Sequence, residues 1–139
     1  MSRSFVIDNS VVMAWCFGDE ASAYADAVLE QLSDSTALVP AIWPLEVVNV
    51  LLVAERKKRI KFADSVRFLS LLSALPIVVE PQVQKKMMKE LLSLGRNSEL
   101  SAYDTAYLAL SMRDSCPLAT LDTRLLEAAK KLDIPVFSP

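Results

Sequence analysis

The stretch "FVIDNSVVMAW" (5–15) joins two apolar runs through a single carboxylate. The residues at 4–7 predict a strand that ends at Asp8, and the apolar pattern resumes at Val11. Asp8 and Ser10 are suited to cap a short helix that begins near Val11. A strand followed by an acid and a helix is typical of open α/β sheets, in which the carboxyl ends of parallel strands border the ligand crevice.

The rest of the chain alternates between helical patterns and short β-type runs. Helices are predicted at 20–34, 43–59, 62–75, 83–95, 101–114 and 124–133. Strands are predicted at 4–7, 36–40, 77–79, 117–121 and 135–137. Gly95 is expected to close the helix at 83–95. The alternation predicts one α/β domain over residues 1–139, with a mainly parallel sheet and helices on both faces.

The composition excludes several classes of enzyme. With 139 residues and 53% hydrophobic residues, the chain can bury the core of one domain. It contains no histidine, which excludes Ser–His and Cys–His nucleophiles and the HExxH zinc site. It contains two glycines, too few for a P-loop or a dinucleotide-binding turn, so no nucleotide cofactor is expected. Its chemistry must use carboxylates, hydroxyls, amides, Lys or Arg.

The sequence also indicates the environment of the protein. No stretch approaches the roughly 20 apolar residues needed to cross a bilayer, and the N-terminus lacks the order of a signal peptide, so we expect a cytoplasmic protein without a membrane partner. Cys16 and Cys116 are isolated in the sequence. A disulfide between them remains open, although a reducing interior suits the chain better.

Two of the expected helices begin with one acid in an otherwise apolar stretch. Within 41–54 the only polar side chains are Glu46 and Asn49, which lie three residues apart and so share a face. Within 101–112, Asp104 is the only charged residue. Burying an ionised carboxylate without a partner costs several kcal/mol, and neither stretch supplies a Lys or Arg.

The acids Asp8 and Asp122 each follow an expected strand, so all four acids are expected at one edge of the sheet. Each also has a structural interpretation, as an N-cap for Asp8 and Asp122, a helix-dipole partner for Glu46, and a capping box with Ser101 for Asp104. Four clustered carboxylates repel unless protons or metal ions neutralise them, and Mg²⁺ or Mn²⁺ prefers oxygen ligands. The pattern predicts metal-assisted phosphoester hydrolysis, in which one acid takes a proton from water.

Three short polar residues lie beside these acids or on the same helix face, namely Ser10, Asn49 and Thr120. They are suited to orient the carboxylates by hydrogen bonds. Ordinary turn and cap bonding is the alternative interpretation of all three.

Four segments resemble, in order, the acidic motifs of PIN-domain ribonucleases, and closely those of VapC-type toxins of bacterial toxin–antitoxin modules. The segments are "FVIDNSVVMAW", "WPLEVVNVLL", "SAYDTAYLALSM" and "PLATLDTRLLEAAKKLDIPVF". The resemblance covers essentially the whole chain. It implies a three-layer α/β/α fold and a Mg²⁺- or Mn²⁺-dependent endoribonuclease that inhibits translation. It also implies a homodimer and a cognate antitoxin that blocks the active-site groove.

The resemblance assigns roles to the acids. Asp8 and Asp104 would be the most direct metal ligands, and Glu46 and Asp122 would complete the site, through water or directly. The positions of Ser10, Asn49 and Thr120 commonly support such a site. Many relatives carry another acid two residues after the last motif Asp. Arg124 stands there in this chain, which favours one metal ion in the resting protein.

The run "ERKKRIK" (55–61) is the densest basic segment of a chain with a net charge of −2. It is suited to steer an RNA backbone, although a solvated helix end is the alternative. The predicted RNA contacts are Arg56, Lys57, Lys58, Arg59, Lys61 and Arg124.

Two other functions remain open at this point. "VIDNSV" (6–11) resembles the Asp-x-Asp nucleophile motif of haloacid-dehalogenase-type phosphatases, although Ser10 replaces the second acid. The other alternative is a catalytically silent module that only binds RNA or protein. Acids at all four motif positions favour the enzyme.

Overall fold

The computed structural model describes residues 3–81 and 84–139, and within them it contains a sheet of four strands. The strands are β1 (Arg3–Ile7), β2 (Ser35–Val39), β3 (Ile77–Val79) and β4 (Leu118–Ala119). Their order in the sheet is β3-β2-β1-β4, and every neighbouring pair is parallel. The prediction of an α/β fold with a parallel sheet is therefore confirmed.

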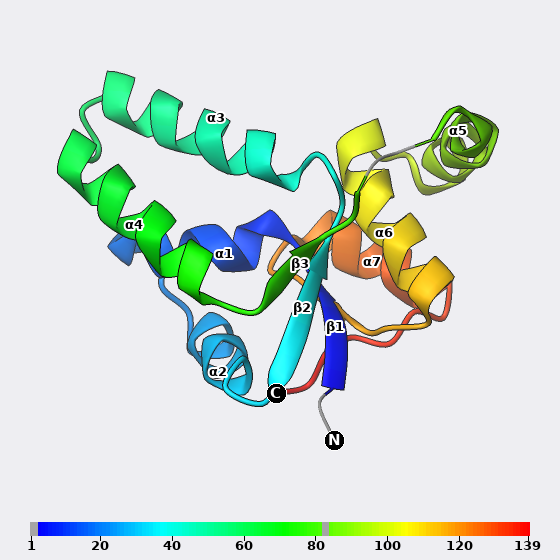
Figure 1. The fold of residues 1–139 in the computed structure, drawn as a ribbon. Coiled ribbons are helices and arrows are strands. Elements are labelled where there is room, and N and C mark those ends of the chain that lie inside the picture. The colour runs from blue at the N-terminus through cyan, green and yellow to red at the C-terminus, as the bar shows by residue number, and fades with distance from the viewer. Residues whose placement is uncertain (1–2, 82–83) are drawn as a thin grey trace.

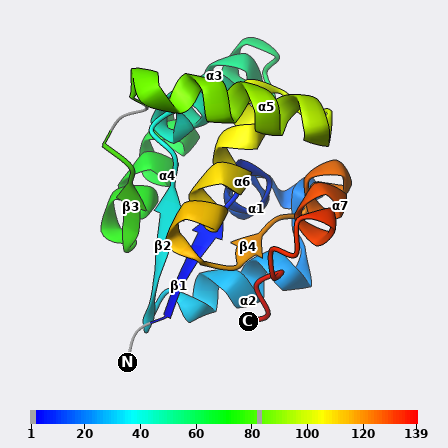
Figure 2. The ribbon, with the colours of Figure 1, turned by 90° about the vertical axis from the view of Figure 1, so that its right-hand side faces the viewer.

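Helices cover both faces of this sheet. They are α1 (Asn9–Cys16), α2 (Ala23–Gln31), α3 (Trp43–Arg56), α4 (Phe62–Ala74), α5 (Met88–Ser98), α6 (Ala102–Asp114) and α7 (Thr123–Lys131). Helices α6 and α7 lie on one side of the sheet and α1 and α2 on the other, which gives three layers (Figures 1 and 2). Helices α3 and α4 form a pair that extends beyond the sheet (Figure 1).

The central strand β1 organises the core. Phe5, Val6 and Ile7 are fully buried because helices pack on both faces of this strand, which explains its continuous apolar run. Val11 of α1 and Leu108 of α6 are likewise fully buried. Since β1, β2 and β4 run in parallel, their carboxyl ends point toward one edge of the sheet, where α1 and α7 begin.

Several boundaries differ from the predicted ones. The expected strand at 135–137 forms only a single bridge, between Leu118 and Val136. The strand expected at 117–121 is limited to the two residues of β4, and the next residue, Thr120, donates a side-chain hydrogen bond to Asp8. The predicted helix start at residue 83 lies outside the described residues, and α5 itself begins at Met88.

The prediction that Gly95 closes a helix is wrong. Helix α5 continues to Ser98 and ends at Glu99, which adopts the left-handed conformation with φ of 56°. Gly95 lies inside the helix, where an added Cβ would approach Thr105 Oγ1 to 3.2 Å. The glycine therefore allows α5 to pack closely on α6.

Replacing Gly95 by valine is expected to lower the free energy of unfolding by about 1–3 kcal/mol, the usual cost of overpacking. Chemical denaturation followed by circular dichroism measures this loss. Gly18→Val is the matched control, because a Cβ at the exposed Gly18 meets no atom within 4 Å. Equal losses in the two variants would contradict the close-packing explanation.

Cys16 and Cys116 are both free thiols, so the disulfide that the sequence left open is not formed. In the part of the chain that the structure describes, no helix combines the length and the apolar character required to span a membrane.

Candidate active site

The four predicted acids come from four different elements. Asp8 follows β1 and caps α1, and Asp122 caps α7, while Glu46 and Asp104 lie in the first turns of α3 and α6. The charges of Asp8 and Asp104 act on the carboxyl of Glu46, and those of Asp8 and Asp122 act on Asp104. The structure therefore places Asp8 and Asp104 within electrostatic reach of Glu46, and Asp122 within reach of Asp8 and Asp104.

Asp8 lies deepest, with 5% of its surface exposed. Its Oδ2 accepts hydrogen bonds from Ser10 Oγ at 2.6 Å, Thr120 Oγ1 at 2.9 Å and the Ser10 N–H at 3.3 Å. Burial raises the pKa of Asp8 more than these hydrogen bonds lower it, and the charge of Asp122 raises it further. Among the described residues no group donates a hydrogen bond to Oδ1, so this oxygen is available to a ligand.

Backbone groups determine the direction of these hydrogen bonds. Ser10 Oγ accepts the Leu121 N–H at 2.9 Å, and Thr120 Oγ1 accepts the Asp122 N–H at 3.0 Å. Since a hydroxyl has a single proton, and both hydroxyls already accept from the backbone, each donates that proton to Asp8. The segment after β4 thereby fixes the orientation of the Asp8 carboxylate.

Asn49, the third predicted supporting residue, is exposed and makes no hydrogen bond to any of the four acids. Tyr107 of α6 contacts the site instead, because its hydroxyl donates to Glu46 Oε1 at 2.6 Å. Tyr107 was not among the site residues predicted from the sequence. The available signal was its spacing, since a residue three positions after Asp104 shares its helix face.

Burial is also the largest cause of the raised pKa of both Glu46 and Tyr107. It raises the pKa of Glu46, while the hydrogen bond from Tyr107 opposes that rise. It raises the pKa of Tyr107 as well, and the acceptor Glu46 adds to the effect, so Tyr107 stays a hydrogen-bond donor at all ordinary pH values.

An acid that caps a helix can also contribute a carboxylate oxygen to the site. Asp122 Oδ1 accepts the N–H groups of Arg124 and Leu125, at 2.9 and 3.3 Å, which leaves its other oxygen free of hydrogen bonds from the described residues. Ser101 Oγ accepts the Asp104 N–H at 3.2 Å, so Ser101 rather than Asp104 caps α6. Burial raises the pKa of Asp104, the charges of Asp8 and Asp122 raise it further, and Arg124 lowers it.

The donor chemistry fits a hard divalent cation, because the four side chains offer only carboxylate oxygens. Three of the acids hold a raised pKa and repel one another, so a cation among them would relieve an excess of negative charge. Within residues 3–81 and 84–139, however, no three acidic side chains are close enough to hold an ion by themselves.

One of the cations predicted to contact RNA forms ion pairs within the protein. Arg59 Nη2 lies 2.8 Å from Asp19 Oδ1 and 2.6 Å from Glu20 Oε2, with its guanidinium 3.9 Å from the centre of the Phe17 ring. These partners hold Arg59 against η1 (Gly18–Glu20), and its contact with RNA stays a prediction. Residues 56–61 lie at the far end of α3, about 15 Å along the helix from Glu46. Arg124, by contrast, lies within electrostatic reach of Asp104.

Comparisons with known proteins show the family of the chain. The PIN domain family matches residues 5–131, a range that contains all four acids. The chain belongs to the PIN domain family. PIN domains are generally nucleases that depend on divalent metal ions.

Among solved structures, this PIN domain is similar to the crystal structure of PAE2754 from Pyrobaculum aerophilum, with a TM-score of 0.70. The two chains are 20% identical, over 92% of this chain and 86% of the other. The likeness shows a shared fold. No curated protein matches the chain.

The raised pKa values predict how the stability of the metal-free protein depends on pH. Because Asp8, Glu46 and Asp104 have higher pKa values when folded than when unfolded, the folded state binds more protons. Their contribution to stability is therefore present at low pH and is lost as pH rises through the folded-state pKa values.

Thermal unfolding in EDTA at about pH 5 and about pH 7.5 tests this dependence. We expect Asp8→Asn to raise the melting temperature more at the higher pH than at the lower one. Added Mg²⁺ should stabilise the wild type mainly at the higher pH, where the carboxylates are ionised. A larger gain from Asp8→Asn at the lower pH would contradict the assignment.

Proposed function

We propose that this chain is a Mg²⁺- or Mn²⁺-dependent endoribonuclease that hydrolyses RNA phosphodiester bonds. The observation that carries the proposal is that four carboxylates from four separate elements influence one another electrostatically near the carboxyl edge of a PIN-domain sheet. In a chain without histidine, carboxylates that hold a metal ion offer a means of activating water.

The hydrogen bonds that each carboxylate accepts from the protein indicate its role at a metal ion. Asp8 Oδ1 accepts no hydrogen bond from the described residues, and the Asp104 carboxylate has Ser101 as its one hydrogen-bonding neighbour, which supports these two acids as the direct ligands of one ion. Glu46 and Asp122 each have one oxygen engaged by the protein, and no three acids lie close enough to hold an ion alone. These observations support contact through water for Glu46 and Asp122, since Mg²⁺ usually retains several waters.

A bound ion would supply positive charge at the scissile phosphate and activate the attacking water. The protein contributes orientation and proton transfer. Ser10 and Thr120 fix the plane of the Asp8 carboxylate. The raised pKa of Glu46 brings this carboxylate closer to the range of an effective general base, so it is suited to take the proton of the water.

Incubation of the purified protein with a broad panel of structured and unstructured RNAs tests the proposal. Cleavage that requires Mg²⁺ or Mn²⁺, stops in EDTA and is absent from Asp8→Asn is the expected result. If the wild type cleaves no RNA of the panel faster than Asp8→Asn does, the nuclease proposal is wrong and a catalytically silent binding module is favoured. A trapped phospho-Asp8 would support the phosphatase alternative instead.

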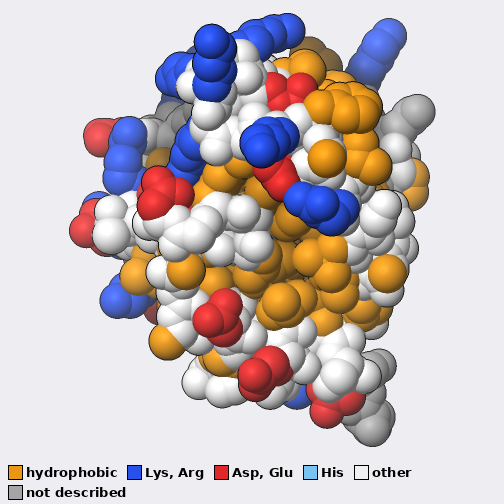
Figure 3. Space-filling model, turned by 90° about the vertical axis from the view of Figure 1, so that its left-hand side faces the viewer, with side chains coloured by type: hydrophobic (Ala, Val, Ile, Leu, Met, Phe, Trp, Pro, Cys, Tyr) orange, Lys and Arg blue, Asp and Glu red, His pale blue; other side chains and the backbone are white. Residues whose placement is uncertain are grey.

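We further propose that the nuclease is the toxin of a toxin–antitoxin pair, that it inhibits translation, and that it forms a homodimer. Support comes from α3 and α4, which expose large apolar side chains, as protein interfaces do. The most exposed are Leu45, Val48, Phe62 and Val66. Hydrophobic side chains gather on the face of the molecule toward which these helices extend, below Lys and Arg side chains (Figure 3).

Two measurements test these partners. The solution mass at micromolar concentration should be that of a dimer, and a strict monomer would contradict the homodimer. Expression of the chain should arrest growth and protein synthesis, and co-expression of the short neighbouring reading frame should restore both. Growth arrest by Asp8→Asn equal to that by the wild type would contradict a nuclease toxin.

Replacing Tyr107 by phenylalanine is expected to lower cleavage by about 10–100-fold, the usual cost of losing a partner that orients a site carboxylate. The ring stays buried, while Glu46 loses the hydrogen bond that lowers its pKa. The acidic limb of the pH–rate profile should therefore move to higher pH. Tyr103→Phe is the matched control on the same helix, because Tyr103 is exposed. An unshifted profile in Tyr107→Phe would contradict this role.

A further inference from the structure

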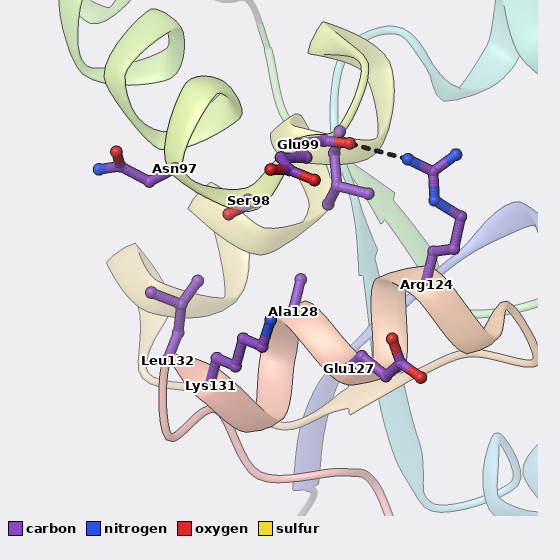
Figure 4. Close-up of a pocket in the computed structure, with 9 residues that line it drawn as sticks. Asn97, Ser98, Glu99, Arg124, Glu127, Ala128, Lys131 and Leu132 are labelled. Carbon is purple, nitrogen blue, oxygen red and sulfur yellow. Dashed lines mark hydrogen bonds between the residues drawn. The ribbon is translucent and has the colours of Figure 1, made fainter.

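A pocket of about 240 Å³ opens between the end of α5 and α7, beside the acids (Figure 4). Helix α7 begins directly after Asp122, so one wall of the pocket continues from the proposed active site. The polar groups that line the pocket are Asn97, Ser98, Glu99, Arg124, Glu127 and Lys131. No part of the proposed hydrolysis uses this pocket.

One hydrogen bond builds the wall nearest the acids. Glu99 ends α5 in the left-handed conformation, and its carbonyl oxygen accepts from Arg124 Nη2 at 2.9 Å (Figure 4). The left-handed conformation is unfavourable for a residue with a side chain. The bond holds Arg124 at the rim between the pocket and Asp104, and among the described residues its other side-chain N–H groups have no hydrogen-bond acceptor.

The charges of the lining groups select the kind of ligand. The cations Arg124 and Lys131 are balanced by the carboxylates Glu99 and Glu127, so the pocket has no net charge with which to attract a phosphate. It combines donors and acceptors with apolar contacts from Ala128 and Leu132.

A nucleobase has the complementary chemistry, with flat apolar faces and an edge of mixed donors and acceptors. The volume lies below the about 300 Å³ at which pockets for drug-sized ligands begin, so it suits a single ring system.

We propose that this pocket binds one unstacked base of a single-stranded RNA whose backbone passes the four acids. The proposal rests on the proposed ribonuclease function and adds to it the place where the enzyme reads sequence. Sequence-specific proteins recognise RNA mostly through such splayed bases.

Binding of short fluorescein-labelled single-stranded RNAs to the Asp8→Asn protein, measured by fluorescence anisotropy in Mg²⁺, tests the proposal without cleavage. For an RNA that binds, each nucleotide in turn is replaced by an abasic one. Removing one particular base is expected to weaken binding about tenfold or more, which is the scale of a base-binding contact. The pocket variant is Asp8→Asn/Glu127→Gln/Lys131→Ala. In this variant the abasic replacement should weaken RNA binding by less than about twofold.

Lys130→Ala in the same Asp8→Asn background is the matched control, because Lys130 is an exposed neighbour outside the pocket lining. The control should keep the full sensitivity to the abasic position, and circular dichroism should show that all variants are folded. Absence of a sensitive position, equal behaviour of the Lys130 and pocket variants, or no RNA binding at all would overturn the proposal.

An RNA-cleavage assay of the wild-type protein distinguishes failure of the pocket proposal from failure of the nuclease proposal. Metal-dependent cleavage without any sensitive base would retain the nuclease and remove the pocket. A sensitive base without cleavage would retain the pocket and remove the nuclease.

Discussion

Replacing Asp8 by asparagine is expected to reduce RNA cleavage by about 10³-fold or more, which corresponds to the several kcal/mol that metal-ion catalysis supplies. The substitution removes the buried charge proposed to hold the ion, while Asn retains the shape of the side chain and an oxygen that can accept from Ser10 and Thr120. Initial rates at saturating Mg²⁺ or Mn²⁺ measure the loss.

Two controls separate this effect from damage to the fold. Asp26→Asn makes the same chemical change at an exposed position of α2 and should leave the rate unchanged. The melting temperature of metal-free Asp8→Asn should equal or exceed that of the wild type, because the buried charge is gone. A folded Asp8→Asn protein with more than a tenth of the wild-type rate would refute the role of Asp8 as a direct metal ligand.

Replacing Phe137 by alanine is expected to lower the free energy of unfolding by about 3–5 kcal/mol, a large part of the stability of a single domain. The ring is 1% exposed and stacks on Phe5, with the two ring centres 3.9 Å apart. Its removal leaves a cavity against the central strand β1, and urea unfolding followed by circular dichroism measures the loss.

Tyr103→Ala is the matched control, because Tyr103 lies at the start of α6 with 58% of its surface exposed. This control should cost less than about 0.5 kcal/mol, as is usual for surface positions. Similar losses in the two variants would show that the C-terminal segment does not complete the core.

Local patterns in the sequence were sufficient for much of the fold. Strand β3 lies at the predicted residues 77–79, and α3 and α4 begin at their predicted first residues. The caps expected at Asp8 and Asp122 are present. These features depend on neighbours within a few residues, so periodicity and capping chemistry specify them.

Other features depend on distant segments. Gly95 has the chemistry of a helix end, but its closeness to Thr105 keeps it inside α5, so the prediction of a helix end there failed. Arg59 belongs to a basic run, and Asp19 and Glu20, about 40 positions earlier in the chain, engage its charge, while its contact with RNA stays a prediction. Nothing in the local sequence of either residue indicates these partners.

The sequence by itself determined which chemistry is possible, because the absence of histidine and the acids at strand and helix boundaries left carboxylates as the reactive groups. Only the tertiary structure decided how those acids are supported. Thr120 reaches Asp8 across 112 positions of the chain, and Tyr107 reaches Glu46 across 61. Such contacts arise from the order of the strands and the packing of α6 on the sheet, and no periodicity within one element encodes either.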